Sequence, residues 1–375
     1  MSITSTLGIA TAALVAGLPA TAAETTDRSP VVYVIPLSGQ MGTDIHPSIY
    51  EEVIEDANEV KPDYIIFKLA SADYDKNFHI QNDDRSEAGM WQNMEVYRDL
   101  MMELQTELPV DKHTRQIMWI EDAVGVSSLL AMSWPEIYMS DGARLEGINT
   151  VQRFAQGWQD PDVREKMYAA WVGIATGFPQ AGGFPLELSR AMIEPEHDLG
   201  VKFEGRDVVW SNDLKGTVWT IDSNDKTVAR FDNDSAEQVM LSRGTVQDLD
   251  DLMFLLGFRE YETADSGVEI VENYKETWRR TFDRCASWLK DARDRQAGGT
   301  VADLGSAKNS LEKVLAAGRR YPAVAARLQA DYGIDLFQLE TQIEVMKRQI
   351  AENRRNSRNR GRSGRGGGVG GGLGP

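Results

Sequence analysis

Short apolar runs alternate with helical stripes along the first part of this chain. The apolar runs are residues 31–36 (VVYVIP), 64–69 (YIIFKL), 115–120 (RQIMWI) and 136–139 (EIYM). Continuous apolar and β-branched residues are typical of strands that are buried on both faces. The helical segments between them are residues 49–60, 90–108 and 124–132. Strands and helices in alternation predict an α/β fold with a mainly parallel sheet and right-handed crossovers.

The remainder of the chain changes character twice. Helices are predicted over residues 162–176 and 186–193 around a Gly/Pro-rich loop at 177–185, followed by a small β element and two short helices. From about residue 268 the pattern is one of long, charged helices. We therefore expect a main domain over residues 24–262, a helical extension over 263–352, and a disordered Arg/Gly-rich tail over 353–375.

The N-terminus resembles a secretory signal. Residues 8–23 (GIATAALVAGLPATAA) are apolar and end in small residues, which predicts a signal peptide over 1–23 and export to the periplasm or the exterior. Because no Lys or Arg precedes this run, an apolar, disordered N-terminus is the alternative. No later segment is apolar enough to span a bilayer, so no membrane span is expected in the mature chain.

Charge restricts the partners of the main body. The formal net charge is −18, and setting aside six arginines of the tail leaves −24 on the residues before it. Such a body is not expected to bind nucleic acid or anionic membranes. The tail resembles RNA-binding Arg-Gly segments, but in an exported protein acidic surfaces, including another copy of the body, are the expected partners. A solvated tail without a partner is the alternative. The single cysteine, Cys285, excludes an intramolecular disulfide.

Two stretches resemble the NfeD-type serine proteases, relatives of signal peptide peptidase A and of the Clp protease proteolytic subunit. The first runs from residues 31–33 and 64–69 through 118–128 (MWIEDAVGVSS) to 136–139 and an Asp141-Gly142 turn. The second comprises 188–193 (LSRAMI), 235–239 (SAEQV), Gly244 and 249–257. The resemblance covers about residues 31–260. It implies a ClpP/crotonase-like spiral fold. It also implies self-association, because proteins with this fold commonly form trimers or hexamers.

The same resemblance identifies candidate catalytic residues. Members of the family cut peptide bonds with a Ser-Lys dyad, and a Gly-Gly turn supplies the oxyanion hole. Aligned on the strand at 136–139, the nucleophile position falls on Gly125, while Ser127 and Ser128 lie two and three residues later. The lysine position corresponds to Lys166. The turn near Ala70 has no glycine pair, so two parts of the machinery are replaced.

Other site chemistries find little support in the sequence. His46, His79, His113 and His197 are scattered, without metal-ligand or triad spacing. The acidic residues between 73 and 87 offer oxygen ligands for Ca²⁺ but lack EF-hand spacing. No cofactor or metal is therefore expected.

Three functions remain open from the sequence. The first is a catalytically inactive, serine-protease-like binding or assembly subunit that forms homo-oligomers and takes a peptide or protein ligand. The second is an active Ser-Lys peptidase that uses Ser127 or Ser128 with Lys166 as the base. The third is a scaffold whose oligomers depend on residues 263–375.

Overall fold

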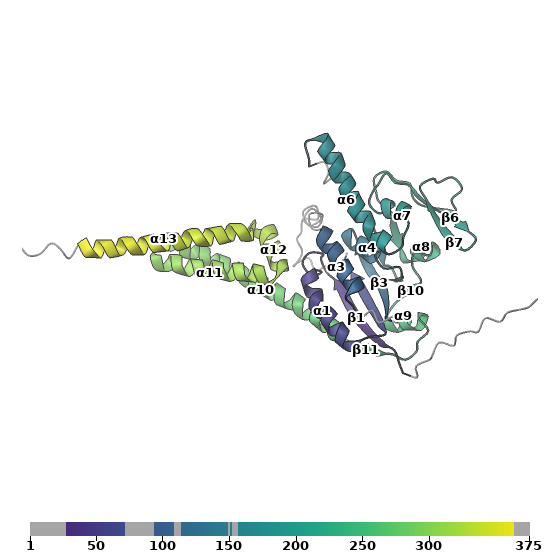
Figure 1. Cartoon of the computed structure of the whole chain (residues 1–375), viewed down its shortest axis with the longest axis horizontal. Helices are drawn as coiled ribbons and strands as arrows, with labels where there is room; N and C mark the ends of the chain where they lie inside the picture. Colours follow the sequence, from purple (N-terminus) through teal and green to yellow (C-terminus); the bar gives the residue numbers. More distant parts are fainter. Residues whose placement is uncertain (1–27, 72–93, 109–113, 149–150, 152–156, 364–375) are drawn as a thin grey trace, which may run out of the picture.

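The computed structural model describes residues 28–71, 94–108, 114–148, 151 and 157–363. Figure 1 shows an α/β domain from which a long helical arm projects. The strands of the main sheet are β1 (Val31–Ser38), β2 (Tyr64–Ala70), β3 (Arg115–Val124), β4 (Ile137–Ser140), β5 (Arg144–Glu146), β9 (Arg230–Asp232), β10 (Thr245–Val246) and β11 (Glu262–Ala264). The helices of the domain are α1 (Pro47–Val60), α3 (Met94–Thr106), α4 (Val126–Ala131), α6 (Pro161–Ala181), α7 (Leu186–Ala191), α8 (Asn233–Gln238) and α9 (Leu249–Leu255).

The main sheet confirms the predicted fold class. Its central order is β10-β4-β3-β2-β1-β11, and every neighbouring pair in that order is parallel. β5 extends the sheet from the end of β3, and β9 pairs with it antiparallel. The four predicted apolar runs form β1 to β4, because each can bury side chains on both faces.

Alternate residues of the strands enter two different cores. Ile35, Phe67 and Ile120 belong to the large core on one face, which α1, α3 and α4 help to cover. Val32, Ile66 and the side chain of Trp119 lie on the other face, where α9 packs. Because successive side chains point to opposite faces and both faces are buried, the strands carry continuous apolar runs.

Helix α6 corrects one sequence-based expectation. A Gly/Pro-rich loop was predicted at residues 177–185, but α6 continues to Ala181 with Pro179 inside it. Ala175 and Phe178 are buried in the large core, and this packing holds the helix past Gly177. Pro179 removes one amide donor from the last turn of the helix, and the burial of its neighbours outweighs this loss.

A second, antiparallel sheet lies beside α7. Its strands are β6 (Leu199–Glu204), β7 (Asp207–Ser211) and β8 (Trp219–Asp222), in the order β7-β6-β8. Trp210 and Trp219 make edge contacts with Phe231 and Phe203, respectively. The small β element predicted from the sequence is therefore present, with its tryptophans in aromatic packing.

The arm has an apolar core of its own. It consists of α10 (Ser266–Gly298), α11 (Val301–Arg320), α12 (Pro322–Tyr332) and α13 (Leu336–Ser363), with α11 packed against the other three. Trp278, Phe282 and Val314 lie in this core together with Cys285, whose thiol is buried. Burial raises the pKa of the Cys285 thiol to about 11, as expected for a packed cysteine.

Both ends of the predicted extension differ from expectation. β11 pairs with β1 at the sheet edge, so the chain completes the sheet before α10 begins. At the other end α13 remains helical to Ser363, which corrects the prediction of a disordered tail from residue 353. Residues 353–360 contain neither Gly nor Pro, so nothing stops the helix there. The rest of the tail and the predicted signal peptide lie outside the described residues.

None of the helices in the described part of the chain is long and apolar enough to cross a membrane.

Candidate functional site

The carboxyl edge of the parallel strands is where open α/β sheets place their ligands. β1, β2 and β3 end there at Ser38, Ala70 and Val124. Each strand is followed by a short connection that bonds to its neighbour: the Gly39 amide donates to Ala70 O at 2.9 Å, and the Ser71 amide donates to Asp122 O at 2.8 Å. The predicted positions Gly125, Ser127 and Ser128 follow directly after this end of β3.

Gly125 forms the turn between β3 and α4. Its φ of 75° and ψ of −131° lie in a region that favours glycine, and it caps α4 without a side-chain hydrogen bond. Its amide donates to Glu146 O at 2.9 Å. The strand–turn–helix junction is thus where the sequence resemblance places the nucleophile, and the residue at the junction carries no nucleophilic atom.

Ser127 and Ser128 both lie in the first turn of α4, and both hydroxyls bond to nearby backbone. Ser127 Oγ donates to Val124 O at 3.0 Å and accepts from the Val124 amide at 3.1 Å. Ser128 Oγ donates to Gly125 O at 2.7 Å. The two side chains are almost fully buried, at 1% and 0% exposed. Their local role is to close the turn at the end of β3.

Lys166 lies on the outer half of α6 and is exposed. The buried residues of this helix begin at Ala175, well past Lys166. No hydrogen bond or ion pair joins Lys166 to Ser127 or Ser128, all three of which lie within the described residues. The structure therefore places the three candidates on neighbouring elements without bringing amine and hydroxyl together.

The resemblance places the family's oxyanion turn near Ala70, where this chain has no glycine pair, and the described residues end there at Ser71. The Ser71 amide already donates to Asp122 O, and its hydroxyl donates to Gly39 O at 2.8 Å. Residues 72–75, like the acidic stretch 73–87, His79 and His113, lie outside the described residues. Within the part of the chain that is described, no three His, Cys, Asp or Glu side chains gather as metal ligands.

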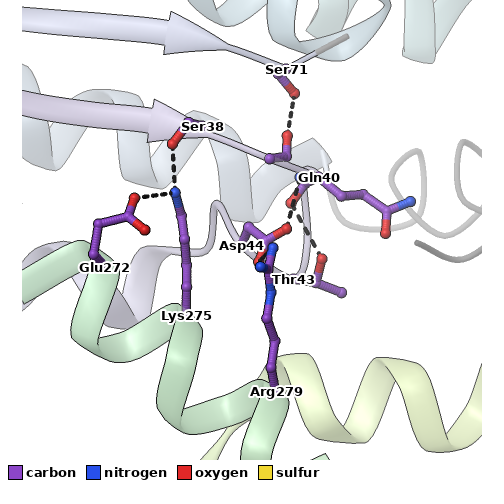
Figure 2. A network of polar contacts seen from close by, with 9 residues as sticks. Ser38, Gln40, Thr43, Asp44, Ser71, Glu272, Lys275 and Arg279 are labelled. Carbon is purple, nitrogen blue, oxygen red and sulfur yellow. Dashed lines mark hydrogen bonds and ion pairs between the residues drawn. The ribbon is translucent and has the colours of Figure 1, made fainter. Parts of the chain in front are cut away.

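A different serine–lysine contact joins the sheet edge to the arm. Lys275 of α10 donates to Ser38 Oγ at the end of β1, and also to Glu272 at 2.8 Å. Figure 2 shows the lysine rising from α10 between these two partners. Its side chain is 8% exposed. Because its amine donates to both partners, Lys275 fastens β1 to α10.

The loop after β1 is fastened to the same helix through Asp44. This fully buried carboxylate accepts from Arg279 at 3.1 Å and from the Gln40 amide at 3.2 Å. A Cβ on Gly39, whose φ is 104°, would lie 2.5 Å from Asp44 Oδ2. Glycine at this position thus leaves space for the buried aspartate.

Sequence reasoning missed this polar network because its members are far apart along the chain. Asp44 and Arg279 are separated by 235 residues, and Ser38 and Lys275 by 237. The one local signal is the pair of glycines, Gly39 and Gly42, flanking a polar loop. Both have positive φ.

A cavity of about 440 Å³ opens on the α9 side of the sheet, beside Ser38. Val34, Pro36 and the indole of Trp119 give it an apolar wall. Lys68 lies 4.5 Å from the Trp119 ring centre and pairs with Glu121 at 2.9 Å. An apolar wall thus lies beside a paired cation and carboxylate.

Comparison with known proteins gives only distant similarities. No protein-family model matches the chain, and no curated protein matches it in sequence. Two similar solved structures are variants of a membrane-bound stomatin-specific protease. One, with a lysine replaced by alanine and a substrate peptide bound, is 13% identical with a TM-score of 0.36, covering 60% of this chain and 80% of the other. The other, with a serine replaced by alanine, is 12% identical with a TM-score of 0.36, covering 63% and 97%.

A third similar structure is a membrane protease specific for a stomatin homologue from Pyrococcus horikoshii. It is 12% identical with a TM-score of 0.34, covering 60% of this chain and 79% of the other. Similarity at this level assigns neither an activity nor a site residue to this chain.

Proposed function

We propose that this chain is a catalytically silent relative of the Ser-Lys proteases with a ClpP/crotonase-like fold. It acts outside the cytoplasm as a binding or assembly subunit. The parallel sheet and the β3–Gly125–α4 turn, which match the order of motifs that the sequence resemblance requires, support the fold assignment. The apolar residues 8–23 support export.

The observation that carries the proposal is the state of the hydroxyls in the first turn of α4. A serine nucleophile needs a hydroxyl that faces substrate and a base within hydrogen-bond reach. Ser127 and Ser128 instead donate to Val124 O and Gly125 O and are buried. Lys166 is exposed and contacts neither.

The Ser38–Lys275 pair does not provide a substitute dyad. Lys275 already donates to Glu272, and no free amide pair faces Ser38 in the described loop, where the Gly39 and Gln40 amides bond to Ala70 O and Asp44. An oxyanion would therefore find no preorganised donors there. A binding role does not require the Lys275 contacts with Ser38 and Glu272 to break.

Hydrolysis of a fluorogenic peptide library by the full chain tests the proposal. We expect no turnover above background from the wild type or from Ser127→Ala, Ser128→Ala or Lys166→Ala. Turnover that is abolished both by a serine substitution and by Lys166→Ala would establish the active peptidase instead. Turnover lost only in Ser38→Ala and Lys275→Ala would move the active site to the end of β1 and contradict the proposal equally.

A further inference from the structure

We propose that the end of α13 docks on the α1/α3 surface of a second copy of this chain. The docking element is the basic tip, defined here as Arg348, Arg354 and Arg355. Its receptor is the acidic face, defined as six exposed glutamates: Glu51, Glu52, Glu55 and Glu59 on α1, Glu103 on α3, and Glu107 directly after α3. The inference rests on the proposed assembly function and names the surfaces that carry it.

The last turns of α13 have no partner helix in the described chain. Leu339, Ile343 and Met346 belong to the arm core, and Ile350 is the last buried residue of the helix. Beyond that residue every described side chain through Arg355 is exposed, and Figure 1 shows the helix running past the end of α10 and α11. Among the described ion pairs, none involves the three arginines of the basic tip. Exposed arginines of this kind gain charge-assisted hydrogen bonds when carboxylates of a partner cover them.

The acidic face carries uncompensated like charge. Glu51, Glu55 and Glu59 are spaced i, i+4 along α1, an arrangement that costs about 0.2–0.5 kcal/mol per pair in a helix. α3 lies alongside, where Asn58 of α1 donates to Glu107 O at 2.8 Å. None of the six glutamates forms an ion pair within the described part of the chain. A cationic partner would relieve this repulsion.

Spacing favours a helix as that partner. Arg348 and Arg355 are seven residues apart, as are Glu52 and Glu59, so each pair lies about 10 Å apart along its helix. Two helices laid side by side would bring these charges into register. A nucleic acid would fit the basic tip but be repelled by the acidic face, whereas a helix from another copy satisfies both.

The two surfaces cannot meet within one molecule. α10 is fastened at its start to α1 by the Ser266 hydroxyl, which donates to Asp56. α10 runs beside α1 as far as Arg279, which pairs with Asp44. The rest of α10, to Gly298, carries the arm roughly 30 Å further from α1. In a two-fold dimer each tip would instead reach the partner's face, and the contact would form twice.

The test is a charge-reversal exchange on the full chain, read by sedimentation velocity. The tip variant reverses the three arginines: Arg348→Glu, Arg354→Glu and Arg355→Glu. The face variant reverses three glutamates of α1: Glu52→Lys, Glu55→Lys and Glu59→Lys. The control variant makes the same charge change as the tip variant on exposed residues far from both surfaces: Arg206→Glu, Lys215→Glu and Arg243→Glu.

We expect the wild type and the control to dimerise, with a dissociation constant that rises as salt is added. Each reversed variant alone should dimerise at least about tenfold more weakly. An equimolar mixture of the tip and face variants should dimerise again, because both contacts of the mixed dimer regain opposite charges. Circular dichroism checks that the variants are folded.

A wild type that stays monomeric at low salt would overturn the inference, as would a mixture that fails to recover. Equal weakening of the control, or binding of single-stranded RNA by the tip without self-association, would overturn it too. These results are independent of peptide hydrolysis, which bears on the proposed catalytic silence alone.

Discussion

The sheet domain and the helical arm differ in how their cores are built. The domain buries strands on both faces between helices, so its large core draws on residues from β1 through to α10. The arm buries one stripe from each helix, and most of its contacts join helices that follow one another in sequence. The arm is therefore a locally assembled unit, whereas its attachment to the domain combines burial of Val271 in the large core with long-range polar contacts.

The largest expected effects come from emptying either core. Phe67 is fully buried and packs 4.5 Å from Trp134, and Trp278 is fully buried in the arm. Replacing either by alanine should cost about 3–5 kcal/mol of unfolding free energy. Hydrogen exchange should then show α11 and α12 losing protection in Trp278→Ala while β2 keeps it. Loss of protection in β2 as well would mean that the two regions unfold as one.

The attachment should respond to Asp44→Ala. This change leaves Arg279 without its buried carboxylate and frees the Gln40 amide, at a cost of about 3 kcal/mol. Denaturant unfolding measures the loss, and small-angle scattering should show a wider spread of arm orientations. Exposed Asp213→Ala is a control with the same chemistry, and an equal loss there would contradict the role of Asp44.

A smaller effect is expected where α1 meets the arm. Tyr33 donates its hydroxyl to Asp56 at 2.6 Å, and Asp56 also accepts from Ser266. Burial and this carboxylate raise the pKa of Tyr33. Tyr33→Phe should lower the unfolding free energy by about 1–2 kcal/mol, measured by chemical denaturation. An unchanged value would show that the Ser266 contact alone holds Asp56.

The smallest effect is a pH dependence at the start of α1. His46 Nδ1 accepts from the Ser48 amide, and burial lowers the pKa of His46. Because the unfolded chain then binds the proton more tightly, stability is full above the ordinary histidine pKa and falls as pH drops below it. His46→Asn keeps a capping side chain and should flatten this slope in thermal melts between pH 5 and pH 7, about the range in which histidine titrates. A slope identical to wild type would assign it to another group.

Sequence patterns predicted the elements that depend on neighbouring residues. Continuous apolar runs located β1 to β4, and the small residues after β3 located α4. β11 was missed because a strand of three residues is too short to show an alternating apolar pattern. Its pairing with β1 defines it as a strand. The length of α6 was missed because the burial of Phe178 outweighs Gly177 and Pro179.

The candidate site was predicted in part. Aligning motifs placed Gly125 at a strand–helix turn, and the structure has that turn. The directions of the Ser127 and Ser128 hydroxyls depend on backbone geometry, which residue spacing does not encode. The Asp44–Arg279 and Ser38–Lys275 contacts required the path of α10 across the end of β1, which only the folded chain defines.

The proposed lack of catalysis depends on the hydroxyls of Ser127 and Ser128. Both donate to nearby backbone carbonyls and are not directed toward a substrate. The most direct measurement is the intact mass of the native chain after exposure to a fluorophosphonate, which forms a stable adduct with an activated serine. We expect an unchanged mass under conditions that fully label an active serine protease. A single adduct, lost in Ser127→Ala or Ser128→Ala, would contradict it.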